Sequence, residues 1–234
     1  MKFSELLWQD TEHIFEACWE NPFVQGIGKG ELPKASLVHY VKQDFEYLNA
    51  MIKAKAIGVT KCTSREDMIM FKDTIDFVLN SETHPHHNLC EQAGVAYEEL
   101  QGYALAPASQ HYVLHMLHHA EKGTLGDVIA VTLACPWVYL NVGERLMKEV
   151  EPDGSHPFND WIRFYGDREE REMYKYIDRL DELAETAAEE EKQRWRTLFM
   201  EGCQLEYMFF EDAYHAKDWP FARTLTGGEK SNAK

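Results

Sequence analysis

Apolar residues recur along most of the chain at intervals of three and four, which is the spacing expected for helices with one buried face. The sequence contains no convincing run of alternating apolar and polar residues of the kind that forms a β-strand. This pattern predicts an all-α protein whose long helices pack side by side. The predicted helices cover residues 2–19, 23–27, 34–61, 65–92, 109–122, 126–150, 157–165, 168–188 and 189–217.

Local signals support several of these helix ends. Asn21-Pro22 closes the first helix, Pro33 suits the first turn of a helix, and Ser64 with Asp67 resembles a capping arrangement. The charged segment from residue 168 keeps an apolar stripe, so we expect a solvated outer helix rather than a disordered run. The stripe consists of Met173, Tyr176, Ile177, Leu180 and Leu183.

A chain of 234 residues can bury one sizeable core, and no Pro/Gly/Ser-rich linker divides it. We therefore expect a single domain over residues 1–222 and a flexible tail over residues 223–234. The chain carries 24 Lys and Arg against 40 Asp and Glu, a formal net charge of -16. Nucleic acids and anionic membranes repel such a surface, so small molecules and proteins remain as partners.

The N-terminus has no apolar signal-peptide core, and no run approaches the ~20 apolar residues that span a bilayer. This predicts a cytoplasmic protein that binds no membrane. The five cysteines are widely spaced and contain no Cys-x-x-Cys pair, which favours reduced thiols over disulfides or a zinc site. They are Cys18, Cys62, Cys90, Cys135 and Cys203.

One of these thiols stands beside a proline within an apolar helical run. In LACPWVYLNVGERL, Pro136 follows Cys135 and removes the hydrogen bond that residue 136 would donate to Thr132. Such irregularities often lie beside functional groups, although a buried cysteine can also serve as a small apolar residue.

Other polar and aromatic residues share helix faces with spacings of three or four. Three long helices could aim such pairs into one cavity with a thiol, two carboxylates and aromatic walls. That lining suits a flat, nitrogen-rich heterocycle, while ordinary core packing accounts for the same spacings. The pairs are Asp44 with Tyr47, Cys135 with Tyr139, and Glu206 with Phe209.

Seven segments, in order along nearly the whole chain, resemble the TenA family of thiaminase II and aminopyrimidine aminohydrolase proteins. The likeness begins at NPFVQGIGKGELP and continues through YVKQDFEYL, SETHPHH, HYVLHM, CPWVYLNVGERL, WIRFYG and LEYMFFEDAY. It implies the haem-oxygenase-like helical bundle, assembled as a homotetramer. It also implies an enzyme of thiamin salvage that needs no cofactor or metal and that binds a small pyrimidine.

The resemblance further implies roles for individual residues. Cys135 would be the nucleophile that adds to the pyrimidine ring, Tyr47 would polarise the sulfur, and Glu206 would act as general acid. Asp44 would hold the aminopyrimidine edge, with Glu82 and His86 in support. The walls of the site would be Tyr112, Tyr139, Tyr165 and Phe209.

The implied reactions are hydrolysis of 4-amino-5-aminomethyl-2-methylpyrimidine to the hydroxymethyl compound and ammonia, and cleavage of thiamin. A formylamino derivative shares the same pyrimidine, and the sequence leaves the preferred substrate open. Phe210, where the family often has Trp, and the run at residues 167–169 depart from the family pattern. They bear on substrate preference rather than on reaction type.

Two alternatives remain. His84, His86 and His87, and then His111, His115 and His118, could present metal ligands, as in a di-iron or haem oxidase of the same fold. Against this, the sequence has no Glu-x-x-His pair on two helices. The second alternative is a non-catalytic regulator that binds a pyrimidine. The acidic surface disfavours DNA binding by such a regulator.

Overall fold

The computed structural model describes residues 1–81, 83–167 and 172–221, and within these residues the regular structure is entirely helical, as the sequence predicted. The expected domain limit at residue 222 and the tail at 223–234 lie outside the described residues. The α-helices are α1 (Phe3–Glu20), α2 (Pro22–Lys29), α3 (Lys34–Lys61), α4 (Arg65–Asn80), α5 (His84–Ala93), α6 (Pro107–Lys122), α7 (Leu125–Val150), α8 (Asn159–Gly166), α9 (Glu172–Thr186) and α10 (Glu189–His215); a 3-10 turn, η1 (Tyr97–Leu100), follows α5.

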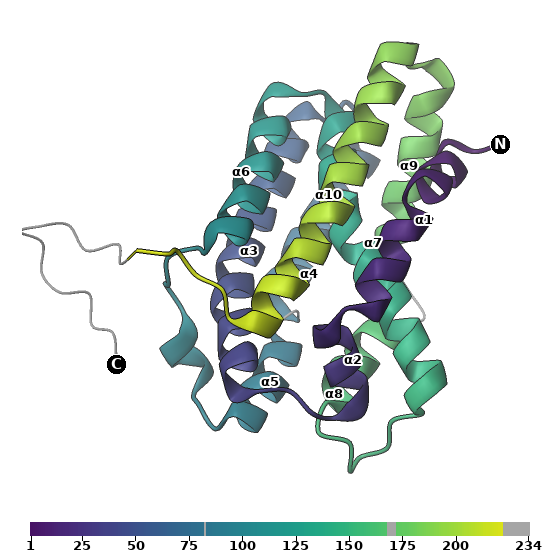
Figure 1. Ribbon diagram of the computed structural model, residues 1–234. Helices are drawn as coiled ribbons and strands as arrows, with labels where there is room; N and C mark the ends of the chain where they lie inside the picture. Colours follow the sequence, from purple (N-terminus) through teal and green to yellow (C-terminus); the bar gives the residue numbers. More distant parts are fainter. Residues whose placement is uncertain (82, 168–171, 222–234) are drawn as a thin grey trace, which may run out of the picture.

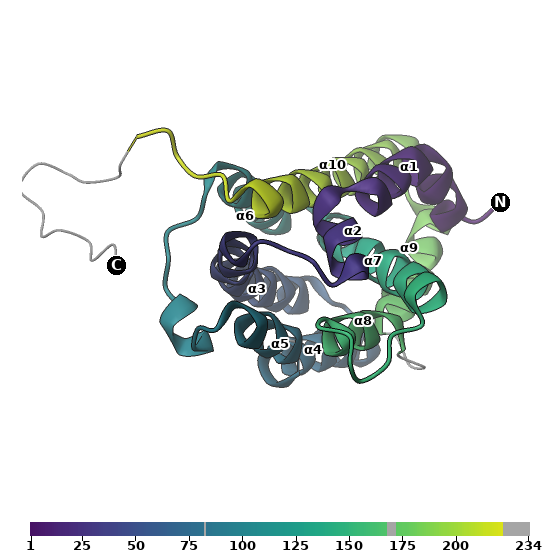
Figure 2. The same cartoon turned by 60° about the horizontal axis from the view of Figure 1, so that its bottom comes forward.

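The long helices lie side by side around α7 (Figure 1). In the view down the bundle, α7 lies between α1 and α10 on one side and α8 on the other (Figure 2). Helix α7 packs most extensively against α10 and also contacts α3, α6, α8 and α9. The central helix therefore touches every element that carries a predicted site residue, apart from α5.

Helix α7 corrects one expectation from the sequence. An 18-residue window within Leu125–Val150 has a mean hydropathy of 1.5, so this helix is long and apolar enough to cross a membrane by length and composition. However, 83% of that window is buried inside the protein. Its apolar side chains form the middle of the core, which explains why they are so numerous.

The helix predicted over residues 65–92 is wrong, because the structure has two helices there. Helix α4 ends at Asn80 and α5 begins at His84, with Pro85 in its first turn. Proline lacks the N–H that a continuous helix would need at that position and crowds the preceding turn. The predicted cap of α4 is confirmed, since the Ser64 hydroxyl accepts a hydrogen bond from the Asp67 N–H at 3.0 Å.

Other helix ends differ from the predictions by a few residues. Helices α6 and α7 begin slightly earlier, at Pro107 and Leu125, and α10 ends at His215. The start of the helix predicted from residue 168 lies outside the described residues. Helix α7 continues through Pro136, whose missing N–H is tolerated within an otherwise complete, buried helix.

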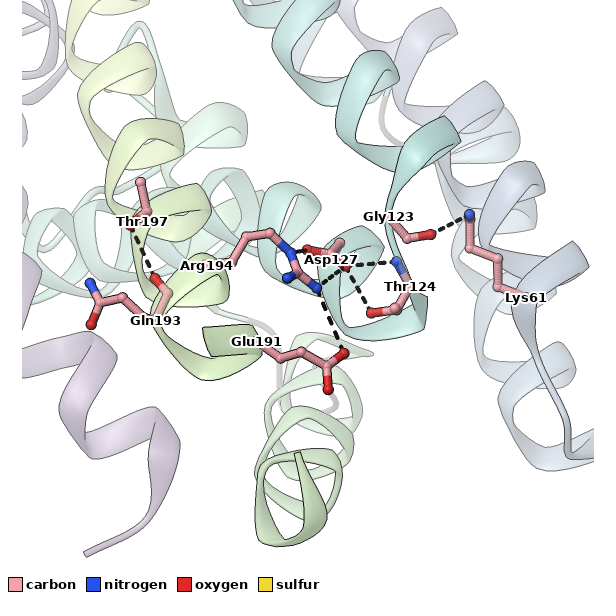
Figure 3. Close-up of polar contacts among 8 residues, drawn as sticks. All are labelled: Lys61, Gly123, Thr124, Asp127, Glu191, Gln193, Arg194 and Thr197. Atoms are coloured by element: carbon pink, nitrogen blue, oxygen red, sulfur yellow. Dashed lines mark hydrogen bonds and ion pairs between the residues drawn. The ribbon is translucent and has the colours of Figure 1, made fainter. Parts of the chain in front are cut away.

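A polar network ties three helices together where α7 begins (Figure 3). Asp127 is 1% exposed and caps α7 by accepting from the Thr124 backbone N–H at 2.6 Å. Arg194 of α10 donates two hydrogen bonds to the same carboxylate, and Lys61 at the end of α3 donates to the Gly123 carbonyl. The network fixes α3, α7 and α10 relative to one another.

Candidate active site

One face of α3 supplies a continuous line of functional side chains. Tyr40, Asp44, Tyr47, Met51 and Lys55 follow one another at spacings of four, three, four and four residues, so they share a helix face. All five are buried. This line runs past the middle of α7 and forms one side of the candidate site.

The structure brings the predicted thiol and carboxylate to this line. Cys135 of α7 and Glu206 of α10 are buried, and both interact electrostatically with the Tyr47 and Tyr112 hydroxyls. Burial raises the pKa of Tyr47 well above its ordinary range, and the charge of Cys135 raises it further. Burial also raises the pKa of Tyr112 well above its ordinary range, and the charge of Glu206 raises it further. Both phenols therefore keep their protons at neutral pH.

The two phenol rings also contact each other. The Tyr47 and Tyr112 ring centroids are 4.7 Å apart. Both hydroxyls are buried; they interact with each other, and Tyr112 also with Glu206, without reaching good hydrogen-bond geometry within the described part of the chain. Buried hydroxyls are usually hydrogen-bonded, so these two are suited to donate to a polar group beside the thiol.

Asp44 is held by a histidine from another helix. The Asp44 Oδ2 lies 2.7 Å from the Nε2 of His86 on α5, and the His86 ring is fully buried. Tyr97 of η1 packs on that ring with a centroid distance of 5.6 Å. This arrangement orients the Asp44 carboxylate and leaves its other oxygen available for a ligand's amino edge.

Aromatic side chains enclose the remaining sides. The rings of Tyr139 of α7 and Tyr165 of α8 contact each other at a centroid distance of 4.6 Å and are tilted by 47°, and the Tyr139 hydroxyl lies 2.7 Å from the Tyr40 hydroxyl. Phe209 of α10 contacts the edge of the Tyr40 ring at 5.3 Å. Flat walls of this kind bind a planar heterocycle by stacking.

The approach of α8 to α7 depends on two glycines. A Cβ on Gly143 would lie 2.5 Å from the backbone carbonyl carbon of Tyr165, and one on Gly166 would lie 2.5 Å from the Gly143 oxygen. Only residues without a Cβ allow the two backbones to come this close. The glycine pair thus sets the position of Tyr165 against Tyr139.

A cavity of about 120 Å³ lies directly beside the thiol. Cys135, Tyr139 and Tyr165 separate the cavity from the aromatic side chains described above. Residues of α3, α4 and α9 form its other walls. The cavity is lined by Leu48, Met51, Lys55, Thr74, Phe77, Val78, Thr132, Leu133, Cys135, Pro136, Tyr139, Leu140, Phe164, Tyr165, Met173 and Tyr176.

Most of the predicted site residues thus meet in one place. Cys135, Tyr139 and Tyr165 line the cavity, whereas Asp44, Tyr47, Tyr112, Glu206 and Phe209 lie in the packed cluster next to it. His86 contacts Asp44, as a supporting residue would. Glu82 lies outside the described residues.

The histidines of α6 form a different region. His115 and His119 are 4.8 Å apart between ring centroids, and the His115 Nδ1 lies 3.7 Å from Glu201. Burial lowers the pKa of His115 to about 4, which keeps this ring neutral. Across residues 1–81, 83–167 and 172–221, no three His, Cys, Asp or Glu side chains converge as metal ligands.

Sequence reasoning missed three residues of this region, namely Tyr40, Lys55 and Tyr97. Tyr40 and Lys55 continue the face defined by Asp44 and Tyr47, so extending the helical spacing in both directions could have found them. A lysine on an otherwise buried helix face itself indicates a specific polar contact, because lysine is almost never fully buried unless it is paired. Tyr97 stands in a short turn whose position only the tertiary structure defines.

Comparison with solved structures defines the class of fold. A TenA homologue from P. horikoshii OT3 superposes with a TM-score of 0.79 at 22% identity, covering 93% of this chain and 100% of that one. A haem oxygenase from Leptospira interrogans superposes with a TM-score of 0.55 at 14% identity, covering 91% and 100%. The chain therefore has the haem-oxygenase-like helical fold that the resemblance implied.

The chain belongs to the TENA/THI-4/PQQC family, whose profile matches residues 8–216. It is 33% identical to a protein of Halalkalibacterium halodurans named aminopyrimidine aminohydrolase, over 94% of this chain and 99% of that protein. A Helicobacter pylori protein of the same name is 30% identical over 92% of this chain and 100% of its own length. With these relatives, the chain is an enzyme of the hydrolase class.

Proposed function

We propose that this protein is an aminopyrimidine aminohydrolase of thiamin salvage that acts through Cys135. The observation that carries the proposal is the meeting of a thiol, two phenol hydroxyls and a buried carboxylate beside a cavity. Cys135 and Glu206 each interact with Tyr47 and Tyr112, and Cys135 also lines the cavity. The names of the relatives agree with this reading.

Substrate binding follows from the polar and aromatic groups. The Asp44 carboxylate, oriented by His86, would accept hydrogen bonds from the amino group and ring edge of the pyrimidine. Tyr139 and Tyr165 would stack on the ring, with Tyr112 and Phe209 on the remaining sides. This placement leaves the substituent on the ring pointing past Cys135.

The chemistry begins when the Cys135 sulfur forms a bond to a ring carbon while Glu206 gives a proton to the ring. Tyr47, which keeps its proton, stabilises the sulfur as a thiolate by donating a hydrogen bond. The bond between the methylene carbon and the protonated amine then breaks, and ammonia leaves. Water adds to the methylene carbon and gives up one proton, which ammonia takes to form ammonium. The carbon–sulfur bond breaks, which regenerates the thiolate, and the ring proton returns to Glu206. The net reaction converts protonated aminomethylpyrimidine and water into hydroxymethylpyrimidine and ammonium.

The direct test is ammonia release from 4-amino-5-aminomethyl-2-methylpyrimidine by the purified protein, compared with cleavage of thiamin. Cys135→Ser should abolish turnover of both while leaving the fold intact, because a serine hydroxyl has a far higher pKa than a thiol. Cys62→Ser is the matched control, since Cys62 lies at the far end of α3 and its thiol donates to the Gly58 carbonyl. Full activity in Cys135→Ser would refute the covalent mechanism.

We also propose a homotetramer and a cytoplasmic location, both of which rest on the family to which the chain belongs. Light scattering on the purified protein tests the first. A mass of one or two chains at micromolar concentration would contradict it.

A further inference from the structure

Tyr40, which the proposed chemistry does not use, forms a buried hydroxyl pair with Tyr139. The Tyr40 side chain is fully buried, and its hydroxyl lies 2.7 Å from the Tyr139 hydroxyl, in a hydrogen bond that either oxygen could donate. The Tyr40 ring stacks on Phe23 at a centroid distance of 5.0 Å, and Phe209 contacts its edge. This packing fixes the Tyr40 ring, so its hydroxyl is a rigid partner for Tyr139.

Asp44 favours one direction of this hydrogen bond. It follows Tyr40 by four residues and shares its face of α3. Burial raises the pKa of Tyr40 well above its ordinary range, and the charge of Asp44 raises it further. Because a carboxylate attracts a hydroxyl proton, the Tyr40 proton is drawn toward Asp44, and the Tyr40 oxygen is left to accept from Tyr139.

Tyr139 carries its hydroxyl to the side of the site where Asp44 lies. Its ring lines the cavity beside Cys135. Burial raises the pKa of Tyr139 well above its ordinary range, and Tyr40 and then Asp44 raise it further, so Asp44 acts on this hydroxyl as well. When Tyr139 donates its proton to Tyr40, the remaining lone pair of its oxygen can only accept a hydrogen bond.

We propose that Tyr40 makes the site specific for 4-aminopyrimidines over 4-oxopyrimidines by holding Tyr139 as a hydrogen-bond acceptor. The inference rests on the proposed function, in which Asp44 accepts from the amino group of the pyrimidine. That amino group has a second N–H, which donates to the Tyr139 oxygen. In a 4-oxo analogue a carbonyl oxygen takes this place, and two acceptors meet without a proton between them.

Asp44 alone does not provide this discrimination. A 4-oxopyrimidine has a ring N–H beside its carbonyl, and a carboxylate accepts from a ring N–H as well as from an amino group. A Tyr139 hydroxyl that was free to rotate would also tolerate the analogue, because it could donate to the carbonyl. Tyr40 prevents this rotation, so it is a positioning residue that acts on the ligand through Tyr139.

The test measures, by calorimetry, the affinities for the product, 4-amino-5-hydroxymethyl-2-methylpyrimidine, and for its 4-oxo analogue. The wild type should bind the amino compound at least about 100-fold more tightly. Tyr40→Phe keeps the ring but cannot accept the Tyr139 proton. This ratio of affinities should therefore fall by roughly 10-fold, mainly through tighter binding of the 4-oxo analogue.

A double-mutant cycle tests whether Tyr40 acts through Tyr139. Tyr139→Phe removes the acceptor itself and should lower the ratio about as much as Tyr40→Phe does. The double variant should show the same ratio as Tyr139→Phe alone, because nothing is left for Tyr40 to orient. Tyr103→Phe is the matched control, since Tyr103 is 38% exposed, and it should keep the wild-type ratio.

The outcomes separate this inference from the proposed function. A wild type that releases ammonia from the aminomethylpyrimidine but binds both compounds equally overturns the inference alone. Tyr40→Phe that weakens binding of both compounds without changing their ratio shows a purely structural role and overturns it too. A further fall of the ratio in the double variant contradicts action through Tyr139. A protein that binds the amino compound selectively but releases no ammonia refutes the proposed function and leaves the role of Tyr40 standing.

Discussion

Replacing Gly143 with alanine tests whether the closeness of α7 and α8 positions the site. The new Cβ would lie 2.5 Å from the Tyr165 carbonyl carbon and 2.7 Å from the Gly166 nitrogen. Carbon atoms prefer separations of about 3.5–4.0 Å, so the α8 backbone must retreat by roughly 1 Å. The obstacle is backbone rather than a flexible side chain, so no rotamer change can relieve it.

The size of the effect follows from this displacement. Overpacking a core contact costs about 1–3 kcal/mol, which corresponds to a fall in Tm of roughly 2–12 °C for a chain of this size. Since α8 carries Tyr165, the aromatic wall moves with it. A displacement of about 1 Å near reacting groups can cost ~100-fold, so we expect kcat/KM to fall by roughly 10- to 100-fold.

Thermal denaturation followed by circular dichroism measures the first effect, and ammonia release from the aminomethylpyrimidine measures the second. Gly154→Ala is the matched control, because a Cβ there would meet nothing within 4 Å. A Gly143→Ala protein with wild-type Tm would refute the close approach. Lower Tm with unchanged kcat/KM would show instead that Tyr165 is not part of the substrate wall.

Three further predictions concern the acid groups and the metal alternative. Glu206→Gln should lose ~10²- to 10⁴-fold in kcat with product binding retained, whereas Asp44→Asn should mainly weaken product binding; the reverse pattern, measured by kinetics and calorimetry, would exchange their roles. Burial alone would raise the pKa of Asp127, but hydrogen bonds from Arg194 and Thr124 outweigh it and hold the pKa below the ordinary 3.8. Its contribution to stability is therefore complete above about pH 4 and is lost as pH falls further, so urea titrations of Asp127→Asn should show lower stability at neutral pH and a flatter dependence below pH 4. Activity should survive exhaustive chelation, and a loss that one added metal restores would favour the histidine alternative instead.

The helices were largely predictable because their apolar periodicity survives in the sequence. The break between α4 and α5 was not predicted, although Pro85 marks it, since proline cannot occupy the interior of a regular helix without cost. The 3-10 turn at Tyr97 could not be predicted, because its residues show no period and its position depends on packing against α3 and α5. Residues without periodicity are placed by tertiary contacts alone.

The site was predictable only in part. Spacing placed Asp44 beside Tyr47 and Cys135 beside Tyr139, but spacing within one helix says nothing about which helices meet. Family resemblance supplied that information for Glu206. The contact of His86 with Asp44 joins residues 42 positions apart, and the approach of Lys55 to Thr132 joins residues 77 positions apart. Such long-range pairs follow from the packing of α3 against α5 and α7.

The burial of α7 has a consequence for how the chain is synthesised. Its most extensive contact is with α10, which ends at His215, whereas α7 ends at Val150. At about 5–20 residues per second, a ribosome needs roughly 3 to 13 seconds to add the intervening segment. During that interval the most apolar helix of the nascent chain lacks its main partner. A ribosome that stalls before residue 189 would therefore leave a product in which the face of the central helix that packs against α10 is uncovered, a form in need of a chaperone and prone to aggregate.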